Sequence, residues 1–235
     1  MESTINSGVL TVQQFDSFEE LADIAVGWDA DFRQLNAESF RSDLFQAQFG
    51  SLLLSNVRFG CHVDQRGTAP VGMRTFAVPN VDCPEIRWFG HVTGPDVLLV
   101  FPTHGEIQAF SRTGFSIATF SIPEALLEEF FERNGGPDPS RLLGSSETIV
   151  QAPHALLDEL RDQLHQLQAM MLSDSGPAIL RTLGGELKNR LLFALFQVLT
   201  HANLPSKLSG ASSQRTLSHL FDMLRAHPQR PLRVA

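Results

Sequence analysis

The chain has 235 residues, of which 43% are hydrophobic and 19% are charged, and its formal net charge is −8 at pH 7. That length allows one large domain or two small ones with a buried core, and the composition is ordinary for a soluble globular protein. The acidic balance argues against a broad basic face that would grip nucleic acid.

The N-terminal segment and the two cysteines lead us to expect an intracellular protein. The first residues contain neither the basic start nor the long apolar core of a secretory signal. The most apolar late stretch, 187–199, is too short to cross a bilayer and contains Lys188 and Arg190. Cys61 and Cys83 form no disulfide framework and no CxxC motif, although a redox switch between them stays open. We therefore expect a reduced, cytoplasmic protein that does not associate with membranes.

Most of the chain up to residue 150 follows a strand pattern. Residues 1–14 are expected to form a flexible or lightly docked arm, and a short helix follows, with Asp16 or Ser17 as its N-cap and Gly27 at its end. The predicted strands, separated by turn residues, are 42–48, 51–59, 73–78, 85–92, 97–102, 107–112 and 115–121. Many short strands at this spacing predict a barrel or a sandwich, and 18 phenylalanines with no tyrosine favour an apolar interior.

The rest of the chain is predominantly helical. The predicted elements are a helix over 123–134, a short strand over 148–150, helices over 152–172 and 178–201, a polar linker over 204–213 and a last helix over 214–226. Gly184 and Gly185 weaken the second long helix by about 1 kcal/mol each relative to alanine, so we expect a kink or a close helix crossing there. The fold class is therefore α+β.

The helix over 152–172 carries an apolar stripe with spacings of three and four residues. This spacing is typical of the seam of a short coiled coil, and it predicts a dimerisation surface. An amphipathic helix packed on its own domain would show the same pattern, so both interpretations stay open. The residues of this seam are Leu157, Leu160, Leu164, Leu167 and Met171.

Five stretches of the chain carry informative motifs. They are RTLSHLFDMLRAHPQRPLRVA from Arg215, WDADFRQL from Trp28, GMRTFAVP from Gly72, IRWFGH from Ile86 and FSIP from Phe120. The first resembles the segment that leads into the first helix-turn-helix of the AraC/XylS family of transcriptional regulators. The other four are similar to the sensor domains of a subgroup of that family, so the resemblance covers nearly the whole chain.

The resemblance implies three segments with different functions. Residues 1–150 would form a cupin-like antiparallel barrel that senses a ligand, 151–203 a helical dimerisation region, and 204–235 a linker and the start of the DNA-binding domain. The two helix-turn-helix units of the family are not in this chain, so we expect DNA binding only through them. A homodimer and a small-molecule effector are the expected partners, with effector binding in the barrel altering the dimer geometry.

A barrel of these strands would have an apolar lining with a few polar groups. We expect Phe76, Trp88 and Phe101 to line it, and Arg74 or His91 to fix a polar head or carboxylate. Because alternate strand residues share a face, Arg74 and Phe76 are expected on one face and Thr75 on the other.

A cupin-like metal-dependent enzyme is the main alternative. His62, His91, His104 and Glu106 are available, but no HxH pair is present, so we expect no metal and no cofactor. A nucleophile elbow and a phosphate-binding glycine loop are also missing, and we do not expect an enzyme. A third alternative is a regulator whose barrel is filled by side chains and which responds to a partner protein.

Overall fold

The computed structural model describes residues 7–37 and 41–202. The chain divides into two units, Met1–Leu204 and Pro205–Ala235, and the described residues belong to the first. The predicted linker over 204–213, the predicted helix over 214–226 and the C-terminal stretch that resembles the family lie outside the described residues.

Twelve strands and five helices make up the described part of the chain. In chain order they are β1 Ser7–Phe15, α1 Phe18–Ile24, β2 Asp29–Gln34, β3 Ser42–Phe49, β4 Leu52–Phe59, β5 Val63–Thr68, β6 Met73–Pro79, β7 Ile86–Trp88, β8 His91–Thr93, β9 Leu98–Val100, β10 Ile107–Ser111, β11 Phe115–Pro123, α2 Glu124–Arg133, α3 Pro139–Leu143, β12 Thr148–Val150, α4 His154–Leu172 and α5 Gly176–Thr200.

The strands form two antiparallel sheets. The large sheet has seven strands in the order β1-β3-β4-β11-β6-β9-β12, and the small sheet has five in the order β2-β5-β10-β7-β8. The predicted α+β class is confirmed. A closed barrel is not found among the described strands, because β1 and β12 end one sheet and β2 and β8 end the other. The cupin-like prediction is therefore not confirmed.

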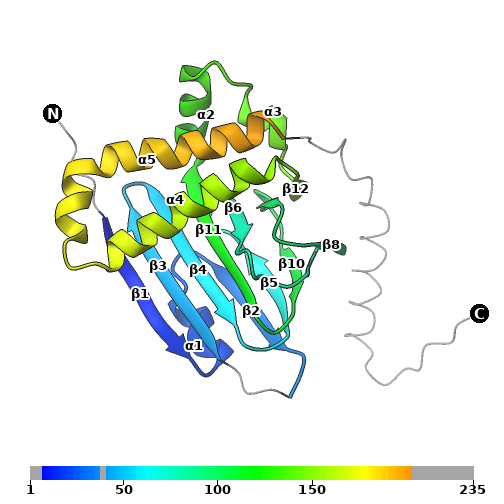
Figure 1. Ribbon diagram of the computed structural model, residues 1–235. Helices are drawn as coiled ribbons and strands as arrows, with labels where there is room; N and C mark the ends of the chain where they lie inside the picture. The colour runs from blue at the N-terminus through cyan, green and yellow to red at the C-terminus, as the bar shows by residue number, and fades with distance from the viewer. Residues whose placement is uncertain (1–6, 38–40, 203–235) are drawn as a thin grey trace, which may run out of the picture. The chain divides into compact units, whose positions relative to one another are not determined.

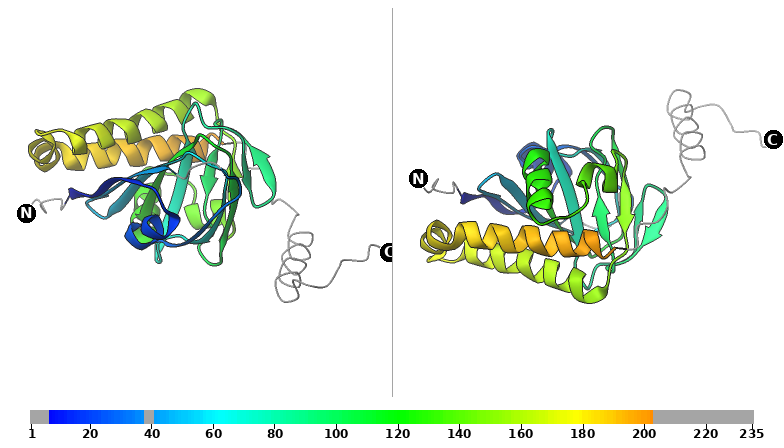
Figure 2. Two further views of the ribbon diagram at one scale, coloured as in Figure 1. Left: turned by 90° about the horizontal axis from the view of Figure 1, so that it is seen from below. Right: turned by 90° about the horizontal axis from the view of Figure 1, so that it is seen from above.

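The described residues of the first unit form layers, with the large sheet in the middle (Figure 1). The two long helices α4 and α5 run side by side across one face of this sheet, as the two views of Figure 2 also show. One apolar core lies between that face and the helices, and a second lies between the other face and the small sheet. The large sheet is thus buried on both faces, which explains the nearly continuous burial along β6 and β11.

The apolar seam of α4 packs within the chain. All five seam residues belong to the helix-side core, together with side chains of the large sheet and of α5, and none is more than 7% exposed. The same spacing of leucines is expected of an amphipathic helix that packs on its own domain. The side chains predicted to meet a second copy are therefore buried in a core that α4 shares with α5 and the large sheet; they are Leu157, Leu160, Leu164, Leu167 and Met171.

Two local predictions differ from the structure. Residues 7–15 form an edge strand rather than an arm. The predicted strand 85–92 is divided into β7 and β8, because Phe89 and Gly90 turn the chain with φ of 47° and 83°. Gly184 and Gly185, where a kink or a close helix crossing is expected, lie inside the uninterrupted helix α5, and Gly184 is buried. None of the helices among the described residues is long and apolar enough to cross a membrane.

Candidate functional site

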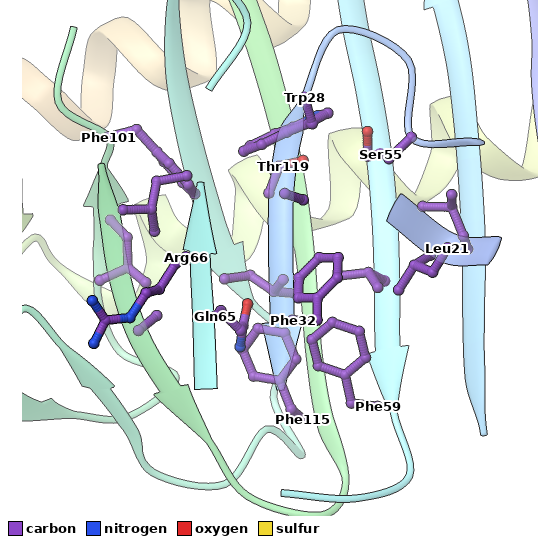
Figure 3. A pocket seen from close by; sticks show the side chains of 18 of the residues that line it. Leu21, Trp28, Phe32, Ser55, Phe59, Gln65, Arg66, Phe101, Phe115 and Thr119 are labelled. Atoms are coloured by element: carbon purple, nitrogen blue, oxygen red, sulfur yellow. The ribbon is translucent and has the colours of Figure 1, made fainter. Parts of the chain in front are cut away.

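A cavity of about 100 Å³ lies between the two sheets (Figure 3). The large sheet supplies one wall, the small sheet the opposite wall, and α1 with the loop after it closes one side. Most of the lining side chains are apolar, which is typical of a small-molecule site. The polar side chains in the lining are Asp29, Gln46, Ser55, Gln65, Arg66 and Thr119.

Three of these polar side chains form a row on the large sheet. Gln46 of β3 is opposite Ser55 of β4, and Ser55 is opposite Thr119 of β11, so the three residues lie side by side across adjacent strands. The Nε2 of Gln46 donates to the Oγ of Ser55 at 3.3 Å. This polar row interrupts a wall that is otherwise apolar.

Gln46 also holds the loop between α1 and β2. The backbone N–H of Val26 donates to its Oε1 at 2.9 Å, and its Nε2 donates to the carbonyl oxygen of Val26 at 3.1 Å. The same loop carries Trp28, whose side chain lines the cavity. A buried amide on one wall therefore fixes the position of a tryptophan that closes the site.

Aromatic rings gather at the other end of the cavity. Phe32 and Phe59 are in edge-to-face contact, with centroids 5.6 Å apart, and Phe59 stacks on Phe115 at 5.2 Å. In Figure 3 these rings lie together, away from Ser55 and Thr119. Ser55 and Thr119 thus lie near Trp28 at one end, and the three rings at the other end lie beside Gln65, whose Nε2 donates to the Oγ of Ser111 at 2.9 Å.

Both tryptophans of the chain line the cavity. Trp28 and Trp88 each meet the ring of Phe101 edge to face, with centroids 5.4 Å and 4.7 Å apart. The indole Nε1 of Trp88 is buried and has no hydrogen-bond partner among the described residues. Tryptophan fluorescence should therefore report on this cavity directly.

Only Asp29 and Arg66 are ionisable among the described residues that line the cavity. Asp29 is exposed, and the Nε of Arg66 lies 3.5 Å from the carboxylate of Asp64. The Nε of Arg66 is buried and has no hydrogen-bond partner among the described residues, so its contact with Asp64 is an ion pair without a hydrogen bond.

The structure brings two of the five predicted ligand residues to this cavity. Trp88 and Phe101 line it, as expected. Arg74 and Phe76 share a face of β6, also as expected. Both faces of β6 are buried, and this one points toward the helices and not toward the cavity. Phe76 stacks on Phe120 in the helix-side core at 5.4 Å. His91 is half-buried on the edge strand β8 and is not part of the lining.

Arg74 has a structural environment of its own. Its Nη1 donates to the carbonyl oxygen of Gly144 at 2.8 Å, and its Nη2 lies 3.2 Å from the carboxylate of Glu124. Burial lowers the pKa of the Arg74 guanidinium, and the charge and hydrogen bond of Glu124 oppose that change. Arg74 therefore ties β6 to α2 and to the end of α3.

The histidines and the glutamate that the sequence offers as metal ligands have other surroundings. His62 meets the ring of Phe110 at 6.1 Å, and His104 and Glu106 are exposed. No group of three or more His, Cys, Asp or Glu within residues 7–37 and 41–202 is arranged to hold a metal ion. Cys61 and Cys83 are both buried, and neither belongs to a disulfide within the described residues.

Comparison with known proteins gives a structural likeness. No family model matches the chain, and no curated protein matches it. Among solved structures, the AraC-like transcriptional activator CuxR aligns with a TM-score of 0.58 and 13% identity, over 94% of this chain and 82% of that chain. ToxT from Vibrio cholerae aligns with a TM-score of 0.31 and 7% identity, over 88% and 68% of the two chains. The likeness to CuxR shows a shared fold, and at that level it confirms the resemblance seen in the sequence.

Proposed function

We propose that this chain is the sensor and dimerisation region of an AraC-type transcriptional regulator, and that the cavity between the sheets is its effector site. The fold shared with CuxR, an AraC-like transcriptional activator, supports the first part. A largely apolar cavity with a few grouped polar side chains supports the second. Such a regulator works in the cytoplasm, and it contacts DNA through helix-turn-helix units in a separate domain.

The observation that carries the proposal is that the cavity and the helices share one sheet. Along β11, Ile117 and Thr119 line the cavity, while Ala118 and Phe120 belong to the core under the helices. Adjacent strand residues point to opposite faces, so a shift of this strand displaces side chains on both sides at once. An effector in the cavity would in this way change how α4 and α5 sit on the sheet.

Arg161 of α4 provides a second connection. Its Nε donates to the carbonyl oxygen of Pro79, and its Nη2 to that of Pro95, each at 3.0 Å. Between these two carbonyls the chain passes through β7, which contributes Ile86 and Trp88 to the cavity. An effector shifts the helices only to the extent that it binds the two arrangements with unequal affinity.

We propose a homodimer as the working state of the regulator. Because the seam of α4 is buried in its own chain, the surface between the copies would lie outside those five residues. An effector that moves α4 and α5 would alter the geometry or the affinity of that dimer, and with it the spacing of the DNA-contacting regions.

Native mass spectrometry of the purified chain tests this function. We expect an organic small molecule bound in stoichiometric amount, carried over or selected from a compound library. Ala109→Leu, which fills the cavity from β10, should abolish that binding, whereas the same change at the exposed Ala169 of α4 should not. A stoichiometric transition metal without an organic ligand would instead favour a metal-dependent enzyme. Ligand binding that Ala109→Leu leaves unchanged would contradict the effector site.

A further inference from the structure

We infer that the cavity takes a small, uncharged molecule with an apolar body about one ring in size and a single hydroxyl or carbonyl group. This inference rests on the proposed function, because it names the class of effector. The apolar body would lie against Phe32, Phe59 and Phe115, and the oxygen would reach Ser55 and Thr119 at the other end (Figure 3).

The volume of the cavity sets the size of the ligand. An apolar cavity of about 150 Å³ in a protein interior binds benzene. The cavity between the sheets has about 100 Å³ and is open to solvent beside Asp29, which is exposed. One ring or a short chain fits this space, whereas a nucleotide or a long lipid does not.

The polar row supplies the hydrogen bonds for one oxygen. The Oγ of Ser55 accepts a hydrogen bond from Gln46, which leaves the Ser55 hydroxyl proton to be donated elsewhere. Thr119 lies opposite Ser55 in register and presents a second hydroxyl to the same space. The remaining amide capacity of Gln46 is used on Val26. Two neighbouring hydroxyls on an apolar wall suit a single hydroxyl or carbonyl group of a ligand.

The charges of the lining disfavour an ionised ligand. Arg66 is paired with Asp64 at 3.5 Å, although its buried Nε makes no hydrogen bond, and Asp29 would repel a carboxylate. An ammonium group would lose its hydration and find only the carboxylate of Asp29, which is exposed to solvent. The cost of that desolvation is large when no partner compensates it.

Three probes of similar size separate these requirements: benzyl alcohol, toluene and benzoate. Calorimetry and tryptophan fluorescence on the full chain would measure their dissociation constants. We expect benzyl alcohol to bind about tenfold more tightly than toluene, the effect of one hydrogen bond in a dry site. Benzoate should bind at least about a hundredfold more weakly than benzyl alcohol.

Variants of Ser55 and Thr119 test whether their hydroxyls bind the oxygen of the ligand. The double variant Ser55→Ala, Thr119→Val should weaken benzyl alcohol about tenfold and change toluene by less than about twofold. Thr182→Val, on the exposed face of α5, is the matched control and should change neither. Thermal unfolding of each variant confirms that it is folded.

The outcomes separate this inference from the proposed function. Equal binding of toluene and benzyl alcohol, tight binding of benzoate, or no binding of any probe overturns the inference. If another compound binds and Ala109→Leu abolishes that binding, the effector site stands although its ligand class is different. If Ala109→Leu has no effect on any ligand, the effector site itself is wrong.

Discussion

Val26, on the loop after α1, and Gln46, on β3, are joined by two hydrogen bonds. The side-chain amide of Gln46 pairs with the backbone N–H and carbonyl of Val26, as the backbone of an adjacent strand would. The Val26 N–H donates to it at 2.9 Å and the Val26 carbonyl accepts from it at 3.1 Å. Gln46 is fully buried, and the loop that it holds places Trp28 on the cavity. The shape of one side of the site thus depends on a single side-chain amide.

Gln46→Met should loosen this loop. We expect a loss of about 1–3 kcal/mol in the free energy of unfolding, because the backbone groups of Val26 lose their partners. Urea unfolding measures that loss, and hydrogen exchange should show faster exchange at the Val26 amide. Gln13→Met, at an exposed position of β1, is the control and should cost less than about 0.5 kcal/mol. Unchanged exchange at Val26 would show that the loop is held by other contacts.

Arg161→Met should detach α4 from the loops around β7. Arg161 is 4% exposed, and it donates to the carbonyl oxygens of Pro79 and Pro95 and to the carboxylate of Asp158. We expect a loss of about 2–3 kcal/mol in unfolding free energy, since two backbone carbonyls lose a charged donor. Arg190→Met removes an exposed ion pair with Glu186 and should cost no more than about 0.5 kcal/mol. Equal effects of the two variants would contradict this role.

The stability of the chain should fall at alkaline pH through Cys83. Burial raises the pKa of the Cys83 thiol; the N–H of Ser116 opposes that change, Asp82 adds to it and Arg58 opposes it. The unfolded thiol therefore ionises first, so the unfolded state binds fewer protons and stability decreases as the pH rises above about 8.5. One such group contributes a slope of at most about 1.4 kcal/mol per pH unit. Urea unfolding across pH should show a shallower decline for Cys83→Ala. An identical decline in both proteins would exclude Cys83 as its source.

The double variant Leu160→Asp, Leu164→Asp should unfold the chain rather than merely separate two copies. These side chains are 0% and 5% exposed and belong to the core between α4 and the large sheet. Two buried carboxylates without partners should cost at least about 5 kcal/mol, which is comparable to the total stability of a typical domain. Circular dichroism and native mass spectrometry distinguish the outcomes. Leu183→Asp, at an exposed site of α5, should remain folded, whereas a folded, monomeric double variant would place the seam between chains.

Secondary structure was largely predictable because it depends on local pattern. The predicted strands 51–59 and 115–121 correspond to β4 and β11, and the predicted helix 152–172 corresponds to α4. Short strands without a clear apolar alternation were not predicted, β2 and β5 among them. Both belong to the small sheet, which is exposed on one face, so their outer positions carry polar residues of many kinds.

The orientation of faces was not predictable from the period of a strand. Alternation correctly placed Arg74 and Phe76 together, but on a sheet buried on both sides either face can be apolar. The residues that were missed, Ser55 and Thr119, lie in strands that were predicted, and their polar character on an apolar face was the available signal. Likewise, leucines at seam spacing in α4 do not reveal whether their partner is a second helix or the chain's own sheet.

Burial of the large sheet on both faces has a consequence for how this scaffold could be re-engineered. β4 and β11 each contact the cavity with one face and the core under the helices with the other. A substitution that alters ligand specificity on either strand therefore also affects the packing of the helices. The small sheet alternates between buried and more exposed positions, as along β7 and β10. Ala109 or Ile107 can be exchanged with compensation at outward-facing neighbours. New ligand specificities should therefore be selected most readily on the small sheet, with the large sheet left intact as the transmitting layer.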